Sequence, residues 1–222
     1  ATMKGVLVMN TPNANTISAT EHTVALILAL ARNVHEGYHS MIHGNWEREK
    51  LIGTELRNKT IGVVGLGKIG TEVIKRLHPF KINVLGFDPY IKKNNYELDY
   101  VEIVKLDDLC EKSDFITIHV PKTDSTIGLF DLDRLKMMKP TAQIINCARG
   151  GIIDEDALLI ALNNGIISGA ALDVFENEPV TDSPLIRAKN ILFTPHLGAS
   201  TFEANQGVST AICEQVRDYL IN

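Results

Sequence analysis

The feature that most constrains this chain is a glycine-rich turn, Gly65-Leu66-Gly67-Lys68-Ile69-Gly70. The turn follows a short apolar run at residues 61–64 and precedes a segment with a helical pattern at residues 68–78. In this context Gly65 permits the tight turn, Gly67 lets a pyrophosphate approach the backbone, and Gly70 lets the helix pack on the strand. The amides and the dipole of the helix then favour the anion. The sequence therefore predicts a dinucleotide-binding fold.

The rest of the chain alternates short apolar runs with helical segments. Further strands are expected at residues 83–87, 115–118, 142–146, 167–172 and 191–193, and further helices at residues 106–112, 132–137, 154–164 and 202–220. Strands that are buried on both faces and separated by helices form parallel sheets with helices on both sides. The expected fold class is therefore α/β, a doubly wound parallel-sheet Rossmann domain.

The composition argues against several classes of function. The net charge of -5 is unfavourable for binding nucleic acid, and the Lys92-Lys93 doublet is interpreted as loop surface. The longest uncharged apolar run, residues 24–31, is too short to span a bilayer, and the N-terminus lacks the features of a signal peptide. Cys110, Cys147 and Cys213 show no metal-like or redox-like spacing. We expect a cytoplasmic protein without a bound metal, a nucleic-acid partner or a membrane partner.

An acidic residue follows the second expected strand. Asp88 comes directly after residues 83–87 and is followed by Pro89. A carboxylate at this position accepts hydrogen bonds from the adenosine ribose and repels a 2'-phosphate, so NAD is the expected cofactor rather than NADP. The alternative interpretation is that Asp88 and Pro89 only form a turn.

Three further strands are followed by groups that suit hydride transfer. Because ligands bind beyond the carboxyl ends of parallel strands, Arg149, Glu178 and His196 are expected to converge beside the cofactor. His196 would remove the hydroxyl proton of a hydroxy acid during oxidation and return it during reduction. Glu178 would orient the imidazole and stabilise its protonated form. Arg149 would bind a substrate carboxylate or polarise the carbonyl, and Asp173 would hold the nicotinamide carboxamide.

Each of these residues also has a purely structural interpretation. A single histidine after a proline is often a loop residue, and Arg149 would be explained equally by neutralising Asp154. The backbone of His119-Val120-Pro121, after another expected strand, would border the adenosine, and Cys147 would contribute backbone rather than its thiol. Surface or interface positions are expected for the histidines of a long helix at residues 18–43, which are His22, His35, His39 and His43.

At these residues the chain resembles the D-2-hydroxyacid dehydrogenase family. The resemblance runs in order along essentially the whole chain and rests on Val8-Met-Asn-Thr-Pro12, Gly53-Thr-Glu-Leu56, the glycine-rich turn, Asn146-Cys-Ala-Arg-Gly-Gly-Ile-Ile-Asp-Glu155, Gly169-Ala-Ala-Leu-Asp-Val-Phe175, Glu178-Pro179 and Thr194-Pro-His-Leu-Gly-Ala-Ser-Thr201. It implies a catalytic set of Arg149, Glu178 and His196. The cofactor contacts that it implies are Lys68, Ile69, Asp88, the backbone of Cys147, Ala148 and Arg149, Asp173, and the loop from His196 through Gly198 to Ala199.

The resemblance also implies NAD-dependent oxidation of a small 2-hydroxy acid. The motifs are most similar to those of members that oxidise 3-phospho-D-glycerate to 3-phosphohydroxypyruvate in serine biosynthesis. Members that act on glyoxylate, hydroxypyruvate or D-lactate are alternatives. So are members of the family that act as NAD(H)-sensing corepressors and bind protein partners.

Three parts of the chain are expected on this basis. Residues 1–16 would be a remnant of the substrate-binding domain or a linker, with a strand at residues 5–10. Residues 17–201 would form the NAD-binding Rossmann domain, including the long helix at residues 18–43, which starts at a capping box, Ser18-Ala-Thr-Glu21. Residues 202–222 would form a C-terminal helix that returns towards the substrate domain. Because relatives dimerise through the region of the long helix, a homodimer is expected.

Overall fold

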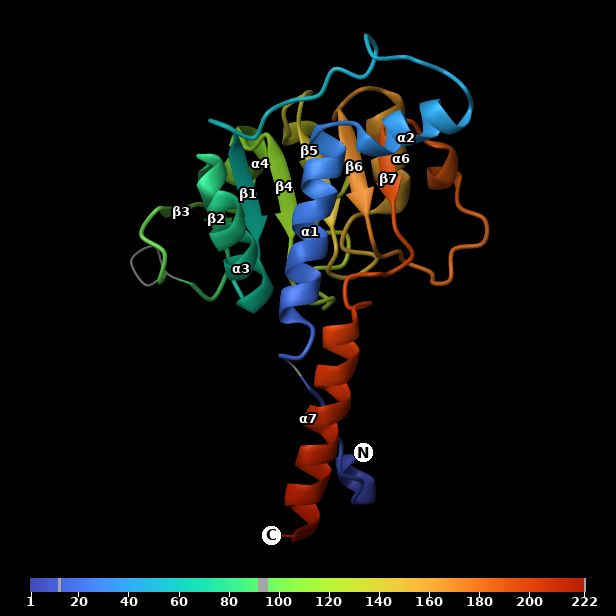
Figure 1. Ribbon diagram of the computed structural model, residues 1–222. Coiled ribbons are helices and arrows are strands. Elements are labelled where there is room, and N and C mark those ends of the chain that lie inside the picture. Colours follow the sequence, from blue (N-terminus) through green and yellow to red (C-terminus); the bar gives the residue numbers. More distant parts are fainter. Residues whose placement is uncertain (12, 92–95, 222) are drawn as a thin grey trace.

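The computed structural model describes residues 1–11, 13–91 and 96–221, and in this part of the chain it contains a seven-stranded sheet. The strand order is β3-β2-β1-β4-β5-β6-β7 (Figure 1), and every pair of neighbours is parallel. The strands are β1 (Thr60–Val64), β2 (Asn83–Phe87), β3 (Val101–Ile103), β4 (Phe115–Ile118), β5 (Gln143–Asn146), β6 (Gly169–Leu172) and β7 (Ile191–Phe193). The predicted doubly wound α/β fold is therefore confirmed.

Helices cover both faces of the sheet. They are α1 (Thr16–Ala31), α2 (Val34–Ile42), α3 (Lys68–Leu77), α4 (Leu106–Lys112), α5 (Leu132–Met137), α6 (Glu155–Asn163) and α7 (Phe202–Ile221). One apolar cluster joins α1 and α3 to one face of the sheet, with Ile27 and Ile74 at its centre. A second cluster joins α4, α5 and α6 to the other face through Leu109, Leu135 and Leu158. Burial on both faces explains the continuous apolar runs of the strands.

The sequence predicts one helix at residues 18–43, but the structure has two. α1 ends at Ala31, and Asn33 adopts a left-handed conformation with φ of 52° before α2 begins. A residue in this conformation cannot continue a right-handed helix, and asparagine tolerates it better than most residues. α1 already begins at Thr16, before the predicted capping box. The Ser18 hydroxyl therefore does not cap the helix, and it lies 2.7 Å from the Thr201 hydroxyl instead.

The two ends of the chain lie side by side away from the sheet (Figure 1). Residues 5–10, predicted as a strand, form no strand, and the Asn10 carbonyl accepts a hydrogen bond from Gln215 of α7 at 3.0 Å. Of the described residues of α7 only Ala204 is buried, because the helix projects from the body. The short edge strand β3 was not predicted because three residues give too little periodicity to recognise. Pro12 and the Lys92-Lys93 doublet lie outside the described residues.

The order of the strands determines where a ligand would bind. β1 is flanked by β2 on one side and β4 on the other, so the winding direction of the sheet reverses between β1 and β4. In open α/β sheets, ligands bind beyond the carboxyl ends of the strands at such a reversal. Within the described residues, no helix has the length and the apolar character that a membrane-spanning segment requires.

Candidate active site

The glycine-rich turn connects β1 to α3 at the reversal point. A Cβ atom on Gly65, whose φ is +96°, would lie 2.6 Å from the carbonyl oxygen of His119, and a Cβ on Gly70 would lie 2.1 Å from that of Gly65. Both glycines are therefore required by close packing of backbone on backbone. Gly67 differs, because an added Cβ would meet nothing within 4 Å. The open side of the turn is thus at Gly67, where the backbone is free to contact a ligand.

A pocket of about 620 Å³ lies along this open side. Its lining residues include Leu66, Gly67, Lys68 and Thr71 from the turn and α3, together with Asn13 and Thr16 from the start of the chain. The Lys68 ammonium donates a hydrogen bond to the Asn13 side chain. The pocket thus presents a cation and the N-terminus of α3 to the same space, which is a favourable environment for a pyrophosphate.

Asp88, which directly follows β2, stabilises the glycine-rich turn by hydrogen bonds. One of its oxygens accepts a hydrogen bond from the Leu66 amide at 3.0 Å, and the other accepts one from the Tyr90 amide at 2.9 Å. Each oxygen keeps further capacity as an acceptor, since a carboxylate offers about four lone-pair sites. The two interpretations of Asp88 are therefore compatible: it shapes the turn and it retains acceptor capacity. Its contact with a ribose stays a prediction.

A second pocket of about 220 Å³ lies next to the first, beyond the carboxyl ends of β4, β5 and β6. It brings together most of the predicted site, namely Ile69, His119, Val120, Pro121, Cys147, Ala148, Arg149, Asp173, His196, Gly198 and Ala199. Asn15 and Ala19 also line it, and no motif in the sequence singled them out. Both lie at the start of α1. Their role depends on how α1 packs across the sheet, which a local sequence pattern does not reveal.

Two of the lining residues are unsuited to proton transfer near neutral pH. Burial lowers the pKa of His119 to about 3, so its imidazole is neutral. Burial raises the pKa of Cys147 to about 12, so its thiol stays protonated. Both residues thus have inert side chains near neutral pH, consistent with the prediction that Cys147 contributes backbone.

Arg149 stands in an exposed loop that a neighbouring side chain holds in place. Asn146 donates a hydrogen bond to the Arg149 carbonyl at 2.9 Å and accepts one from the Ala148 amide at 3.0 Å. The ion pairs of the described residues do not join Arg149 to Asp154, which instead caps α6 by accepting from the Ala157 amide at 2.9 Å. The charge-neutralising interpretation of Arg149 therefore has no support. Arg149 lines the pocket, and its guanidinium donates a hydrogen bond to the Ala148 carbonyl at 2.6 Å.

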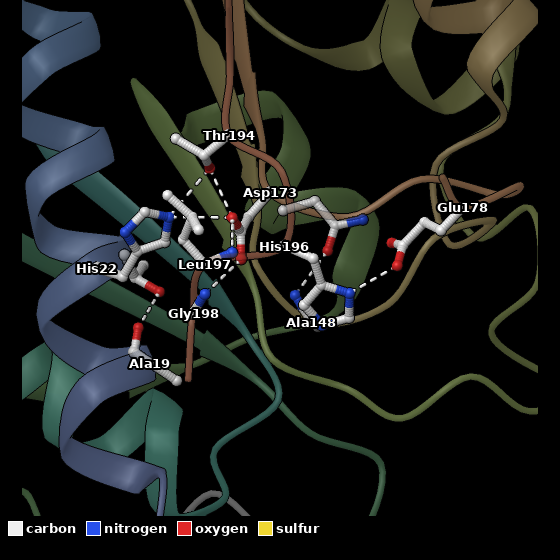
Figure 2. Close-up of polar contacts among 11 residues, drawn as sticks. Ala19, His22, Ala148, Asp173, Glu178, Thr194, His196, Leu197 and Gly198 are labelled. Carbon is white, nitrogen blue, oxygen red and sulfur yellow. Dashed lines mark hydrogen bonds and ion pairs between the residues drawn. The ribbon is translucent and has the colours of Figure 1, made fainter. Parts of the chain in front are cut away.

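His196, which lines the second pocket, forms a hydrogen-bonded pair with Glu178 (Figure 2). The imidazole Nδ1 of His196 lies 2.7 Å from the Glu178 carboxylate, whose other oxygen accepts from the Phe175 amide at 2.9 Å. Burial alone would raise the pKa of Glu178, but the hydrogen bonds from His196 and Phe175 outweigh it and lower the pKa. Because an ionised carboxylate only accepts hydrogen bonds, Nδ1 must carry a proton, and a neutral imidazole has its lone pair on Nε2.

Asp173 lines the same pocket and is held by hydrogen-bond donors of the chain itself. Its side chain is completely buried, and its carboxylate accepts hydrogen bonds from the amides of Leu197 at 2.7 Å and Gly198 at 2.8 Å and from the Thr194 hydroxyl at 2.6 Å. His22 lies 3.1 Å from the same carboxylate. Three of these groups reach Oδ1, and only the Gly198 amide reaches Oδ2, so Oδ2 keeps further acceptor capacity. The contact between Asp173 and a nicotinamide carboxamide stays a prediction.

His22 was predicted to be a surface or interface group, and this is wrong. Its imidazole Nε2 lies within hydrogen-bond distance of both Asp173 and Thr194, and its side chain is only 18% exposed. The sequence carried no signal for this contact, because Asp173 lies 151 positions further along the chain. Only the packing of α1 against the ends of β6 and β7 brings the two residues together.

Comparison with known proteins identifies the class to which this site belongs. Residues 24–198 match the family model described as "D-isomer specific 2-hydroxyacid dehydrogenase, NAD binding domain". Because the match covers most of the chain, the chain belongs to this family, and its cofactor is NAD. The two adjoining pockets, with the open glycine turn and the Glu178–His196 pair, fit a dinucleotide that extends from α3 to the ends of β5 and β6.

Individual relatives with several activities are similar to this chain over most of its length. The chain is 48% identical to a D-3-phosphoglycerate dehydrogenase of Methanocaldococcus jannaschii over 99% of its own length, but it spans only 42% of that relative. Among solved structures, a formate dehydrogenase from Staphylococcus aureus in complex with NAD is 34% identical with a TM-score of 0.87, over 94% of this chain and 63% of that one. A D-lactate dehydrogenase from Aquifex aeolicus, complexed with NAD and lactic acid, is 29% identical with a TM-score of 0.87, over 98% and 70%.

Proposed function

We propose that the full-length protein carrying this chain oxidises 3-phospho-D-glycerate to 3-phosphohydroxypyruvate with NAD, a reaction that would serve serine biosynthesis. The observation that supports hydride-transfer chemistry is the 2.7 Å hydrogen bond between His196 and Glu178, because His196 and Arg149 line the same pocket. The similarity to a relative named D-3-phosphoglycerate dehydrogenase supports the choice of substrate.

His196 serves as the general base in this proposal. Its Nδ1 proton is held by Glu178, so Nε2 is free to accept the proton of the substrate hydroxyl as a hydride leaves the adjacent carbon. NAD, when bound, supplies the acceptor for that hydride. The negative charge of Glu178 then stabilises the imidazolium, and in the reverse direction His196 returns the proton to the developing alkoxide.

Arg149 binds the substrate in this proposal. Its exposed guanidinium suits a planar carboxylate, to which it can donate two parallel hydrogen bonds, and it would equally polarise the carbonyl of the oxidised product. The cofactor is held by the glycine turn with Lys68 and Ile69, by Asp88, and by the backbone at residues 119–121, 147–149 and 196–199. Asp173, which lines the second pocket, would hold the nicotinamide carboxamide.

Replacing His196 with alanine in the full-length protein tests the assignment. Turnover of 3-phospho-D-glycerate should fall by at least about 10³-fold, within the range for loss of a general acid–base group, while NAD affinity stays within about threefold. His78→Ala is a matched control, because His78 stacks on Tyr100 and lines neither of the two pockets. Retained turnover in His196→Ala would contradict the catalytic assignment.

The substrate itself is tested by competition among hydroxy acids. We expect kcat/KM to be highest for 3-phospho-D-glycerate and lower for D-lactate and for reduction of glyoxylate or hydroxypyruvate. A preference for D-lactate would move the protein to the class of its structural relative from Aquifex aeolicus. Absence of turnover with every acid, together with NADH-dependent binding of a protein, would favour the corepressor-like alternative.

We also propose how this chain fits into the larger protein. Residues 1–16 and α7 are the two connections to a substrate-binding domain, and their adjacency, with Gln215 bonded to the Asn10 carbonyl, supports this arrangement. The exposed apolar residues of α2 support a homodimer formed through this part of the chain. The widely spaced cysteines support a location in the cytoplasm, which cell fractionation would test.

A further inference from the structure

A partly buried polar cluster of His22, Asp173 and Thr194 lies beside His196 (Figure 2). Asp173 stands at its centre with a completely buried side chain, between α1 and the loop that follows β7. Burial of a carboxylate raises its pKa, but hydrogen bonds from His22, Thr194 and the two loop amides reverse the effect and lower the pKa of Asp173. The cluster therefore holds a buried negative charge that depends on its donors.

The protons of the cluster can be assigned from its donors and acceptors. The Thr194 hydroxyl donates its single proton to Asp173 at 2.6 Å. His22 Nε2 lies 3.0 Å from the Thr194 oxygen and 3.1 Å from Asp173. Since both of these atoms are then acceptors, Nε2 must carry a proton and donate it to them. The Asp173 carboxylate thus receives four donors, three at Oδ1 and one at Oδ2.

The same carboxylate fixes the loop that carries His196. Two of its four donors are the amides of Leu197 and Gly198, the next two residues after His196. The His196 amide donates to the Asp173 carbonyl at 2.9 Å, and His196 itself has a left-handed backbone with φ of 55°. A non-glycine residue holds this conformation only where its surroundings impose it. The ring of bonds around Asp173 is what imposes it here.

We infer that His22 is a positioning residue for the proposed hydride-transfer reaction. By donating its Nε2 proton to Asp173 and Thr194, it locks the carboxylate in the orientation that holds the 194–198 loop and aims the His196 imidazole at Glu178. His22 is not a lining residue of either pocket, so it acts through Asp173 and Thr194. The inference rests on the proposed function for its kinetic consequence, whereas its structural consequence is independent of it.

A matched pair of variants in the full-length protein tests the inference. Glutamine places an amide N–H about as far from Cβ as the histidine Nε2, so His22→Gln keeps the donor, whereas His22→Leu removes it. We expect His22→Leu to lower kcat about tenfold, the factor that corresponds to one net hydrogen bond, while the Kd for NAD changes by less than about threefold. His22→Gln should recover kcat to within about threefold of the wild type. Thr194→Val, which also removes a donor to Asp173, should act in the same direction as His22→Leu.

Amide hydrogen exchange gives a readout that does not depend on turnover. In His22→Leu the amides of Leu197 and Gly198 should exchange about tenfold faster, while those of the central strand β4 should be unchanged. Both amides should exchange at the wild-type rate in His22→Gln. Unchanged exchange in His22→Leu, or a kcat that falls equally in both variants, would overturn the inference. A wild-type protein without turnover would instead overturn the proposed function, and the exchange of the two amides would still decide the inference.

Discussion

Glu178 and His196 are joined by one short hydrogen bond. The fold lowers the pKa of the carboxylate, which is therefore ionised near neutral pH and accepts the Nδ1 proton of His196. A carboxylate with a lowered pKa stabilises the folded state above the pKa of an unfolded glutamate. That contribution is lost as the pH falls through the folded value. Protonation of Glu178 at acidic pH should therefore both destabilise the fold and remove the group that orients His196.

Glu178→Gln separates these two effects. The amide keeps a similar shape but removes the charge that stabilises the imidazolium, so we expect kcat to fall by about 10²-fold. Because glutamine does not titrate, the variant should also lose less stability than the wild type as the pH falls from about 7 to about 4. Steady-state kinetics and urea denaturation measure the two changes, and a kcat within about threefold of the wild type would contradict the proposed pairing.

The residues of the site were predictable to different degrees for a physical reason. Arg149, Glu178 and His196 each follow a strand of a parallel sheet, so the fold alone brings them to one edge. His22 has no such relation, since its contact with Thr194 spans 172 positions and depends on the docking of α1. The position of Asp173 at the pocket follows from the fold, but the donors that surround its carboxylate do not, because one of them comes from α1.

At the level of elements, strongly periodic segments were predicted well and interruptions were not. β2 and β4 have the predicted bounds, as do α4 and α5, and β1 begins one residue before the predicted run, at Thr60. The break between α1 and α2 was missed because the apolar pattern runs through Asn33, whose left-handed conformation is set by packing. The segment at residues 5–10 has the composition of a strand but no neighbouring strand to pair with among the described residues.

The turn between β1 and α3 allows the glycines required by the fold to be separated from the glycine proposed to bind the cofactor. In Gly70→Ala the new Cβ would lie 2.1 Å from the Gly65 carbonyl oxygen, so the turn must move, and we expect a loss of about 3 kcal/mol in the free energy of unfolding. In Gly67→Ala the Cβ meets no protein atom within 4 Å, so stability should change by less than about 0.5 kcal/mol.

NAD binding should respond to Gly67→Ala even though the stability of the fold does not. The methyl group of Gly67→Ala enters the space proposed for the pyrophosphate, so the Kd for NAD should rise at least about tenfold in a protein of normal stability. Urea denaturation without cofactor and calorimetry with NAD measure the two quantities separately. Normal NAD affinity in Gly67→Ala would show that the pyrophosphate lies elsewhere.

At the level of the whole molecule, exposed apolar side chains form two groups, and each group suits a contact with another domain or subunit. One group lies along α7, where Phe202 is 92% exposed, and it supports the proposed docking of a substrate-binding domain. A second group, here called the α2 patch, consists of Val34, Tyr38, Met41, Ile42 and Trp46. The two groups lie at opposite ends of the molecule, since α2 follows the far end of α1 from the pockets (Figure 1). The proposed contact with a substrate-binding domain and the proposed contact with a partner subunit therefore use different surfaces.

If the α2 patch forms the dimer interface, one charged side chain placed within it should dissociate the dimer. Ile42→Arg places a cation among apolar side chains that a partner subunit would bury, and the cost of burying an unpaired charge exceeds the contribution of an ordinary interface residue. Light scattering should show a dimer for the full-length wild type and a monomer for Ile42→Arg. Ile160→Arg is the control, because Ile160 is also partly exposed but belongs to α6 on the opposite face of the sheet. If both variants remained dimeric, the interface would have to lie outside the α2 patch, and the assignment of this surface to the partner subunit would fail.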